Sequence, residues 1–300
     1  MRTMYHKPAL FFEVLDALEI VEDGIYVDLT FGGGGHSKGI LERLGEKGRL
    51  YVFDQDPDAE QNLPDDPRIV FIPQNFRFLK SYLRMHGVRK VDGILADLGV
   101  SFHQFDTPER GFSFRFDAPL DMRMTQEGES ALEWIKSKEP GEINDVFKKY
   151  GDLKKTYRFS ENLKSKSLSG DVKTTGDVVN LIESSFPGNL HKKIKTLVFQ
   201  SLRMVVNHEM DALEEMLIQC GEVLNEGGVL AVISYHSIED RLVKNYMKSG
   251  NLTGTVEKDF FGVEHTPFKK VTRKPLLPSA EEIEDNPRAR SAKLRVVKKK

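Results

Sequence analysis

Apolar positions near the start of the chain follow a helical period and then give way to short continuous runs. The first set has the spacing of one helix face, ends before Gly24 and consists of Leu10, Phe11, Val14, Leu15 and Leu18. Apolar runs at residues 24–30, 48–56, 68–74 and 91–99 predict four strands, and residues 36–45 predict a helix between the first two. Because strands that alternate with helices pair in parallel and are covered on both faces, this part of the chain predicts a doubly wound α/β sheet.

The alternation stops after the fourth predicted strand. Residues 101–124 are rich in Pro, Gly, Asp and Arg, and their apolar positions follow neither the helical nor the strand period. This predicts a long ordered loop. Helical spacing begins at Ser130, whose side chain can form a capping box with Glu133. A polar stretch, residues 151–176, joins this region to further helical segments, which end in one predicted long helix from about residue 192 to residue 224.

The strand pattern returns at residues 227–237, so the helical region interrupts the sheet. We therefore expect residues 1–106 and 211–300 to form one α/β domain, with residues 107–210 as a helical insertion between its fourth and fifth strands. Two short β-prone runs within residues 268–300 are expected to pair antiparallel at the edge of the sheet.

Charge and cysteine content limit the kinds of binding site and cross-link that we expect in this protein. The 44 Lys and Arg residues are balanced by 46 Asp and Glu residues, so any surface that binds nucleic acid must be local. The single cysteine, Cys220, excludes an internal disulfide, and no Cys/His spacing is typical of zinc, so we expect no metal site. No run of about 18 apolar residues predicts a membrane span. We expect a cytoplasmic protein, and whether it forms a homodimer stays open.

The sequence DLTFGGGGHS, residues 28–37, places four glycines between the first strand and the following helix. A dinucleotide-binding turn requires G-x-G-x-x-G, and in the one frame that ends on Gly39 the central glycine is replaced by His36. S-adenosylmethionine needs close approach of the backbone and an acid for its ribose hydroxyls, and Asp54 ends the second strand about 20 residues later. The alternative is a tight turn without a ligand, with Asp54 capping the next helix.

Polar residues also end the fourth and fifth predicted strands, on the edge where doubly wound sheets bind ligands. Asp97 is a candidate hydrogen-bond acceptor for a substrate at this edge, or alternatively a cap for the next loop. Ser234 and His236 are expected to point to one side of the strand and Tyr235 to the other, with Ser234 contacting substrate. His236 is a candidate for moving a proton or binding a base or phosphate; the alternative is a histidine hydrogen-bonded to its own loop.

Arginines and phenylalanines are interleaved in the irregular segments that flank this predicted site. Guanidinium and aromatic groups together suit a splayed RNA base and its phosphates, and the arginines are Arg110, Arg115, Arg123, Arg288 and Arg290. Phe112 and Phe114 are expected mainly to anchor the loop. Cys220 lies in a helical context without an activating basic neighbour, so we do not expect it to form a reactive thiolate.

Seven motifs resemble, in the same order, those of the MraW-type methyltransferases: DLTFGGGGHS, FDQDP, VDGILADLGVS, RGFSF, PLDMRM, SYHSIEDR and NPRARSAKLR. The resemblance covers the chain from His6 almost to its C-terminus. It implies a class I S-adenosylmethionine-dependent methyltransferase sheet with a helical insertion that recognises the substrate. It also implies methylation of N4 of a decoding-region cytidine in 16S rRNA, within the small ribosomal subunit. Asp97 is then the expected acceptor for the hydrogens of this amine. Methylation of cytosine C5 would require a reactive thiolate, which is not expected of Cys220, so methylation of an amine is favoured over methylation of carbon.

Carried over by motif, the implied cofactor residues are Gly34, Gly35, His36, Asp54, Phe76 against the adenine, Asp97 and Gln104. The sequence departs from the family where Phe102 and His103 replace the usual serine and proline, and where the arginine-rich helix after residue 151 is weakened. Both departures concern the RNA surface. Two other classes of protein stay open: a dinucleotide-dependent dehydrogenase, against which the glycine spacing argues, and a non-catalytic RNA-binding or ribosome-assembly protein that retains the cofactor fold.

Overall fold

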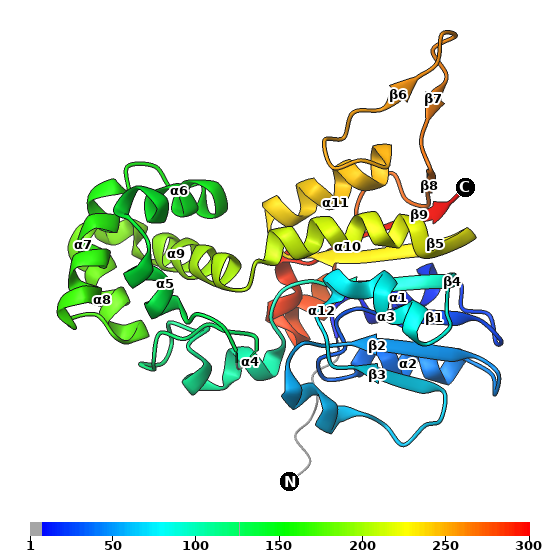
Figure 1. Ribbon diagram of the computed structural model, residues 1–300, viewed down its shortest axis with the longest axis horizontal. Helices are drawn as coiled ribbons and strands as arrows, with labels where there is room; N and C mark the ends of the chain where they lie inside the picture. Colours follow the sequence, from blue (N-terminus) through cyan, green and yellow to red (C-terminus); the bar gives the residue numbers. More distant parts are fainter. Residues whose placement is uncertain (1–7, 126) are drawn as a thin grey trace. The chain divides into compact units, whose positions relative to one another are not determined.

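The computed structural model describes residues 8–125 and 127–300, apart from the side chains of Phe102 and His103. It divides into two compact units (Figure 1). The sheet unit comprises the chain up to Gly99 together with Asp211–Lys300, and the helical unit comprises Val100–Met210. Each unit has its own hydrophobic core. The helical unit begins at Val100, somewhat earlier than the expected residue 107.

A seven-stranded sheet organises the sheet unit, in the order β3-β2-β1-β4-β5-β9-β8. Its strands are β1 (Ile25–Asp28), β2 (Arg49–Phe53), β3 (Ile69–Ile72), β4 (Val91–Asp97), β5 (Leu224–Ser234), β8 (Phe268–Lys270) and β9 (Lys293–Lys299). The strands β1 to β5 pair in parallel, whereas β9 runs antiparallel to both β5 and β8. The doubly wound sheet and its antiparallel edge are thus confirmed.

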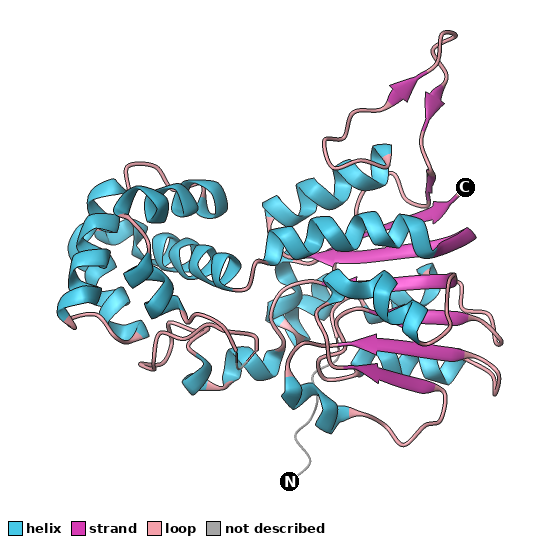
Figure 2. Ribbon diagram, viewed as in Figure 1, coloured by secondary structure: helices cyan, strands magenta, loops and turns pink. Residues whose placement is uncertain are grey.

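Helices cover both faces of this sheet (Figure 2). They are α1 (Phe11–Ala17), α2 (Gly35–Arg43), α3 (Leu79–Met85), α10 (Glu209–Val223), α11 (Ser237–Ser249) and α12 (Ala280–Asp285). Neighbouring side chains of a strand point to opposite faces, so Tyr26 joins the core that contains Leu15 of α1 and Ile40 of α2, while Val27 is buried on the other face.

The order of strands reverses at β1, which is the feature that positions the candidate site. From β1 the chain builds β2 and β3 toward one edge, and then places β4 on the other side of β1. In doubly wound sheets such a reversal opens a crevice at the carboxyl ends of the two central strands, and ligands bind there. The crevice is expected where Asp28 and Asp97 end β1 and β4.

The helical unit packs its helices around an apolar core that includes Trp134, Phe147 and Leu163. Its elements are α4 (Phe102–Asp106), α5 (Ala131–Ser137), α6 (Pro140–Gly151), α7 (Tyr157–Ser169), α8 (Thr175–Ser185), α9 (His191–Val206) and a short 3-10 helix, η3 (Pro108–Arg110). The capping box of Ser130 and Glu133 is confirmed. The expected loop at residues 101–124 is wrong where α4 and η3 form, and the polar stretch 151–176 contains all of α7.

One continuous helix from residue 192 to residue 224 is also a wrong prediction, because the chain breaks between α9 and α10. His208 has a positive φ of 49°, which a helix interior does not permit. Asn207 ends α9, and its side chain binds the backbone of the loop after α4: Nδ2 donates to the Met122 carbonyl at 2.8 Å and Oδ1 accepts from Met124 N at 2.7 Å. The apolar period continues across this break, so the period alone did not reveal it.

A β-hairpin not expected from the sequence projects from the sheet unit between α11 and β8 (Figure 1). Its strands are β6 (Glu257–Lys258) and β7 (Glu264–His265), which pair antiparallel. Among the helices of the described residues, none combines the length and apolar character needed to cross a membrane.

Candidate active site

Three aspartates stand at the carboxyl ends of neighbouring parallel strands. Asp28 ends β1, Asp54 follows the last residue of β2, and Asp97 ends β4. Because β1 lies between β2 and β4, these carboxyl groups come to the same edge of the sheet. The candidate site is built outward from this row.

The glycine turn between β1 and α2 is held from outside by Asp54. Gly32 N donates to Asp54 Oδ2 at 2.8 Å, and Asn62 Nδ2 donates to the Gly32 carbonyl at 2.9 Å. Gly34 is the N-cap of α2 with a φ of 72°, and a Cβ there would lie 3.0 Å from the Phe31 ring. A side chain at this position would be both strained and crowded, so the turn keeps its backbone open to a ligand.

The Asp54 carboxyl is suited to bind hydroxyl groups. Its two oxygens accept from Gly32 N and Asp56 N, and each oxygen has a second lone pair. Burial raises its pKa to about 6, and these two backbone hydrogen bonds limit the rise. The side chain is half-buried, so it is fixed by the protein yet reachable by a ligand. An acid in this place fits the ribose of S-adenosylmethionine, and the glycine turn fits the close approach that this cofactor requires.

Asp97 is held by residues that closely follow the two neighbouring strands, β1 and β5. Its backbone N–H donates to Thr30 Oγ1 at 2.7 Å, and its Oδ1 accepts from the Tyr235 hydroxyl at 2.8 Å. Burial raises its pKa to about 7; the Tyr235 hydrogen bond lowers it, while the charges of Asp28 and Glu239 raise it. The carboxyl therefore changes charge near neutral pH. Its side chain is 21% exposed, which leaves Oδ2 open to a partner.

His36 lies beside Asp97 without forming an ion pair with it. Burial lowers the pKa of His36 to about 4, so the ring is neutral at physiological pH. Nε2 lies 3.1 Å from the Ala9 carbonyl, which can only accept, so Nε2 carries the proton. Nδ1 then presents a lone pair 3.8 Å from Asp97 Oδ2. His36 thus ties the segment before α1 to the glycine turn.

Ser234 and His236, predicted at the end of β5, differ in their surroundings. Ser234 is buried, and its Oγ has no hydrogen-bond partner among the described residues. His236 is the N-cap of α11: Nδ1 accepts from Glu239 N at 3.3 Å, whereas the buried Nε2 lies 3.0 Å from Glu239 Oε1 without forming a hydrogen bond among the described residues. These contacts favour the alternative of a histidine bound to its own loop, and a role of His236 in catalysis stays a prediction.

The sequence analysis missed Asp28 and Tyr235 as parts of this site. Asp28 is buried, and it accepts from Ser37 Oγ at 2.6 Å and from Thr30 N at 3.0 Å. An acid at the end of the first strand, directly before the glycines, was a signal for it. Tyr235 was expected to point away from its neighbours; it does so by reaching across to β4, because Ile233 pairs with Asp97 in the sheet.

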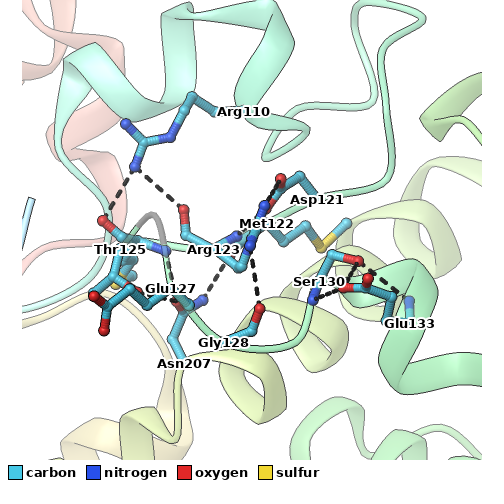
Figure 3. A network of polar contacts seen from close by, with 11 residues as sticks. Arg110, Asp121, Met122, Arg123, Thr125, Glu127, Gly128, Ser130, Glu133 and Asn207 are labelled. Atoms are coloured by element: carbon cyan, nitrogen blue, oxygen red, sulfur yellow. Dashed lines mark hydrogen bonds and ion pairs between the residues drawn. The ribbon is translucent and has the colours of Figure 1, made fainter. Parts of the chain in front are cut away.

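Two of the predicted arginines of the helical unit, Arg110 and Arg123, bind the loop in which they lie, as Figure 3 shows. Arg110 donates to the carbonyls of Arg123 and Met124 at 3.2 and 3.1 Å. Arg123 forms a two-point contact with Asp121, at 2.8 and 2.7 Å, and donates to the Gly128 carbonyl. Their guanidinium groups are thus already engaged within the unit, and contacts with RNA stay a prediction.

The remaining predicted residues are spread over both units. Phe76 begins the short 3-10 helix η2 (Phe76–Phe78) after β3 and is half-buried. Arg288 is half-buried and Arg290 exposed in the 3-10 helix η5 (Pro287–Ser291) of the sheet unit. Gln104 belongs to the helical unit, where its Oε1 accepts from Ser101 N at 3.1 Å. The structure thus brings together Gly34, Gly35, His36, Asp54 and Asp97 within one unit, and Gln104 belongs to the other.

Cys220 lies within α10 and is fully buried. Burial raises the pKa of its thiol well above the usual range, and its Sγ lies 3.3 Å from Met216 Sδ. A thiol of this kind stays protonated and unreactive, so Cys220 does not serve as the nucleophile of a carbon-methylating enzyme.

Comparison with known proteins agrees with this geometry. The sequence pattern of the MraW methylase family matches residues 3–300 of the chain. Ribosomal RNA small subunit methyltransferase H from Bacteroides fragilis (strain YCH46) is 50% identical over 299 residues, which cover 99% of this chain and 98% of the relative. The protein of the same name from Flavobacterium johnsoniae is 49% identical over 296 residues, covering 98% of each.

A solved structure of a methyltransferase from Streptococcus mutans, in complex with SAH, is more distant. It is 12% identical, with a TM-score of 0.42, and the match covers 98% of this chain and 99% of that one. The family match over nearly the full length confirms the expected class I methyltransferase fold and S-adenosylmethionine as the methyl donor. The chain belongs to the MraW methylase family.

Proposed function

We propose that the protein transfers a methyl group from S-adenosylmethionine to N4 of a decoding-region cytidine in 16S rRNA. The relatives that are about half identical over the whole chain carry the name of an rRNA small subunit methyltransferase. The observation that carries the choice of an amine is Asp97: a fixed carboxyl at the end of β4 with one oxygen bound to Tyr235 and the other open. The inert Cys220 argues against methylation of a ring carbon.

When bound, S-adenosylmethionine would supply a methyl group activated by its sulfonium. The amine nitrogen would bond to this carbon as the carbon–sulfur bond breaks in line, S-adenosylhomocysteine would leave, and the methylated amine would lose a proton to water. Gly34 and Gly35 permit close contact with this cofactor, and Asp54 accepts from its ribose hydroxyls. Phe76 covers the adenine, in the role that the family resemblance gives it. Each of these residues binds or orients the cofactor, and none of them reacts with it.

Asp97 orients the target base. Its open oxygen accepts a hydrogen of the exocyclic amine, which turns the nitrogen lone pair toward the methyl group and away from conjugation with the ring. Tyr235 holds the other oxygen, so that the carboxylate cannot rotate away from this position. Ionised Asp97 is the active form, because its negative charge strengthens the hydrogen bond from the amine and neither oxygen carries a proton.

The helical unit is the proposed substrate-recognition domain, with Arg110 and Arg123 shaping the loop at residues 110–128 that meets the RNA. Arg288, Arg290 and Ser234 are proposed contacts from the sheet unit. The partner is the small ribosomal subunit, which places the protein in the cytoplasm. The competing proposal is a non-catalytic assembly protein, which would bind small subunits without methylating them.

Two measurements test the proposal. Mass spectrometry of 16S rRNA from cells that lack the protein is expected to show loss of a methyl group from one decoding-region cytidine. Purified protein is expected to restore that group on small subunits from those cells when S-adenosylmethionine is present. A fully methylated cytidine in the deletion strain, or a methyl group on C5, would overturn the assignment. Binding to subunits without methyl transfer would favour the assembly protein.

A further inference from the structure

The β6–β7 hairpin ends in two phenylalanines that are almost fully exposed. Phe260 is 97% exposed and Phe261 87%, and Val263 beside them is 56% exposed. Two large rings in water are unfavourable for an isolated protein, and exposed apolar groups in a fixed position mark a contact surface. Neither residue contributes to the candidate active site described above.

The turn presents these rings in a defined conformation. Asp259 Oδ1 accepts from Phe261 N and Val263 N, each at 2.9 Å, and Gly262 adopts a positive φ of 81°. The two rings meet edge to face, with centroids 5.6 Å apart. The tip is therefore ordered before any partner binds, which lowers the entropy cost of a contact.

The charges of the hairpin are largely neutralised within it. Lys258 lies 3.3 Å from Glu264, and His265 lies 3.5 Å from Asp259. The segment that follows the hairpin, residues 266–280, is positively charged. It contains no acid, and four of the six residues from position 269 to position 274 are cations. They are Lys269, Lys270, Arg273 and Lys274.

These four cations are exposed, and within the described part of the chain none of them has an ion-pair partner. The hairpin and the cationic segment are consecutive in the chain, because β7 ends at His265 and β8 begins at Phe268. A hollow of about 560 Å³ at the base of the hairpin is lined by His265, Thr266, the end of α11 and Lys300, and by none of these four cations. A chain with a net charge of −2 thus concentrates unpaired positive charge in the segment that directly follows the hairpin with the aromatic tip.

We propose that the hairpin tip and the cationic segment form a second RNA-contacting surface, in which Phe260 and Phe261 stack on unpaired bases while Lys269, Lys270, Arg273 and Lys274 neutralise phosphates. Aromatic rings next to cations are the combination that binds single-stranded RNA without reading its sequence. A protein partner is a weaker match, because protein interfaces disfavour exposed lysine and three of the four cations of this segment are lysines. The inference rests on the proposed function, since it assigns the surface to the rRNA substrate.

Matched variants test the two parts of this surface separately. The edge variant is K269Q/K270Q/R273Q, and its control is K47Q/R84Q/R89Q, which removes three exposed cations of the same unit elsewhere. The tip variant is F260S/F261S, and its control is M85S, since Met85 is 76% exposed. Calorimetry with S-adenosylmethionine is expected to give wild-type affinity for all four proteins, which shows that they fold.

Methylation of small subunits is then measured as kcat and KM over a range of salt concentrations. The edge variant is expected to raise KM with kcat unchanged, and to reduce the slope of log KM against log salt by about 2 to 3, since three phosphate contacts are lost. The tip variant is expected to raise KM at least about fivefold with an unchanged salt slope, because stacking is not ionic. Both controls are expected to match the wild type.

Wild-type KM and salt slope in both variants, with an active wild-type enzyme, would overturn this surface while leaving the proposed function intact. An inactive wild-type enzyme would instead contradict the proposed function, and binding of the variants to subunits by sedimentation then still tests the surface. Binding to protein-free 16S rRNA separates the two kinds of partner. If the tip variant loses affinity for intact subunits but not for the free rRNA, the tip contacts a ribosomal protein and the RNA assignment is wrong.

Discussion

Asp54 has two tasks at once, because the same carboxyl holds the glycine turn and is the expected partner of the cofactor ribose. Its pKa of about 6, raised by burial, makes the second task depend on pH. We expect the affinity for S-adenosylmethionine to fall about tenfold from pH 7 to pH 5 as the carboxyl becomes protonated. The Asp54→Asn variant is expected to bind more weakly and with a flatter pH profile. Calorimetry over this range measures both, and an identical slope in variant and wild type would contradict the ribose contact.

The raised pKa values of Asp54 and Asp97 also affect stability, and here a lower pH is favourable. A carboxyl whose pKa is higher in the folded protein than in the unfolded chain holds its proton more tightly when folded. The free energy of unfolding of the cofactor-free protein therefore decreases as the pH rises from the ordinary carboxyl range toward about 6, for Asp54, and toward about 7, for Asp97. The cofactor-free protein is thus more stable when Asp54 and Asp97 are protonated, which is the state in which they are expected to bind the ribose and orient the amine less well.

Tyr235 is expected to set the pH at which the enzyme becomes active. Its hydroxyl donates to Asp97 and favours the carboxylate, against Asp28 and Glu239, which favour the protonated form; neutral His36 adds no charge. In Tyr235→Phe the acid limb of the kcat profile should therefore move to higher pH, by about one unit if the hydrogen bond contributes about 1.4 kcal/mol.

The matched control for Tyr235→Phe is Tyr246→Phe, which removes a largely buried hydroxyl that is hydrogen-bonded to the Gly221 backbone in the same unit. This variant should be less stable but keep the wild-type pH profile. A Tyr235→Phe profile that coincides with the wild type would show that Tyr235 only supports the fold.

Asp97→Asn separates catalysis from folding. Asparagine keeps the size of the side chain but has one acceptor oxygen and no charge, so the transition state should lose more than the bound substrate does. We expect kcat at saturating S-adenosylmethionine to fall by about two to three orders of magnitude, as when one preorganised electrostatic contact is lost. Thermal melting should stay near that of the wild type. A variant that folds, binds cofactor and methylates at the normal saturated rate would leave Asp97 as a structural cap.

Helices and strands with a regular apolar pattern were predicted from the sequence, whereas elements with a weakened pattern and features that depend on a particular contact between elements were missed. The strands that carry Asp54 and Asp97 were predictable, because buried parallel strands appear as apolar runs that end in turn residues. Helix α7 was not, since serines occupy buried positions on its inner face, at Ser160 and Ser167, and weaken the apolar period. The pairing of Ile233 with Asp97, which brings Tyr235 to the site, depends on strand register, which no local pattern encodes.

The break between α9 and α10 gives a prediction at this scale. Asn207 connects the end of α9 to the loop at Met122 and Met124 with two hydrogen bonds, and donates to the Arg203 carbonyl as well. Its replacement by alanine leaves backbone groups of this loop unpaired, so we expect the free energy of unfolding of the helical unit to fall by about 1 to 3 kcal/mol. Asn180→Ala, on the exposed face of α8, is the control and should change it by less than about 0.5 kcal/mol. Urea denaturation followed by tryptophan fluorescence measures both, and equal midpoints would mean that Asn207 has no such role.

For the whole molecule, the net charge does not show how the charged residues are distributed. A net charge of −2 gave no sign of RNA binding, yet the segment from Lys269 to Lys274 carries four cations without a paired acid in the described structure. Composition averages over both units and over every face of each, whereas association with RNA depends on one face. The local sequence FKKVTRK held this information, and the exposed hairpin that precedes it led to the RNA contact that we propose for the segment.

The division into two units predicts that the helical unit folds by itself. Its core is its own, formed by residues such as Trp134, Phe147 and Phe199, and the polar contacts of Arg110, Arg123 and Asn207 lie within it. Cutting the chain at residues 100 and 210 severs no strand of the sheet.

We therefore expect the isolated fragment 100–210 to be helical by circular dichroism and to unfold in urea in one cooperative transition. Trp134, the single tryptophan of the chain, reports that transition directly. The fragment should not bind S-adenosylmethionine, because Gly34, Gly35, Asp54 and Asp97 all belong to the sheet unit. A fragment without a cooperative transition would show that this core is stable only together with the sheet, and measurable cofactor binding by the fragment would contradict the assignment of the site to the sheet unit.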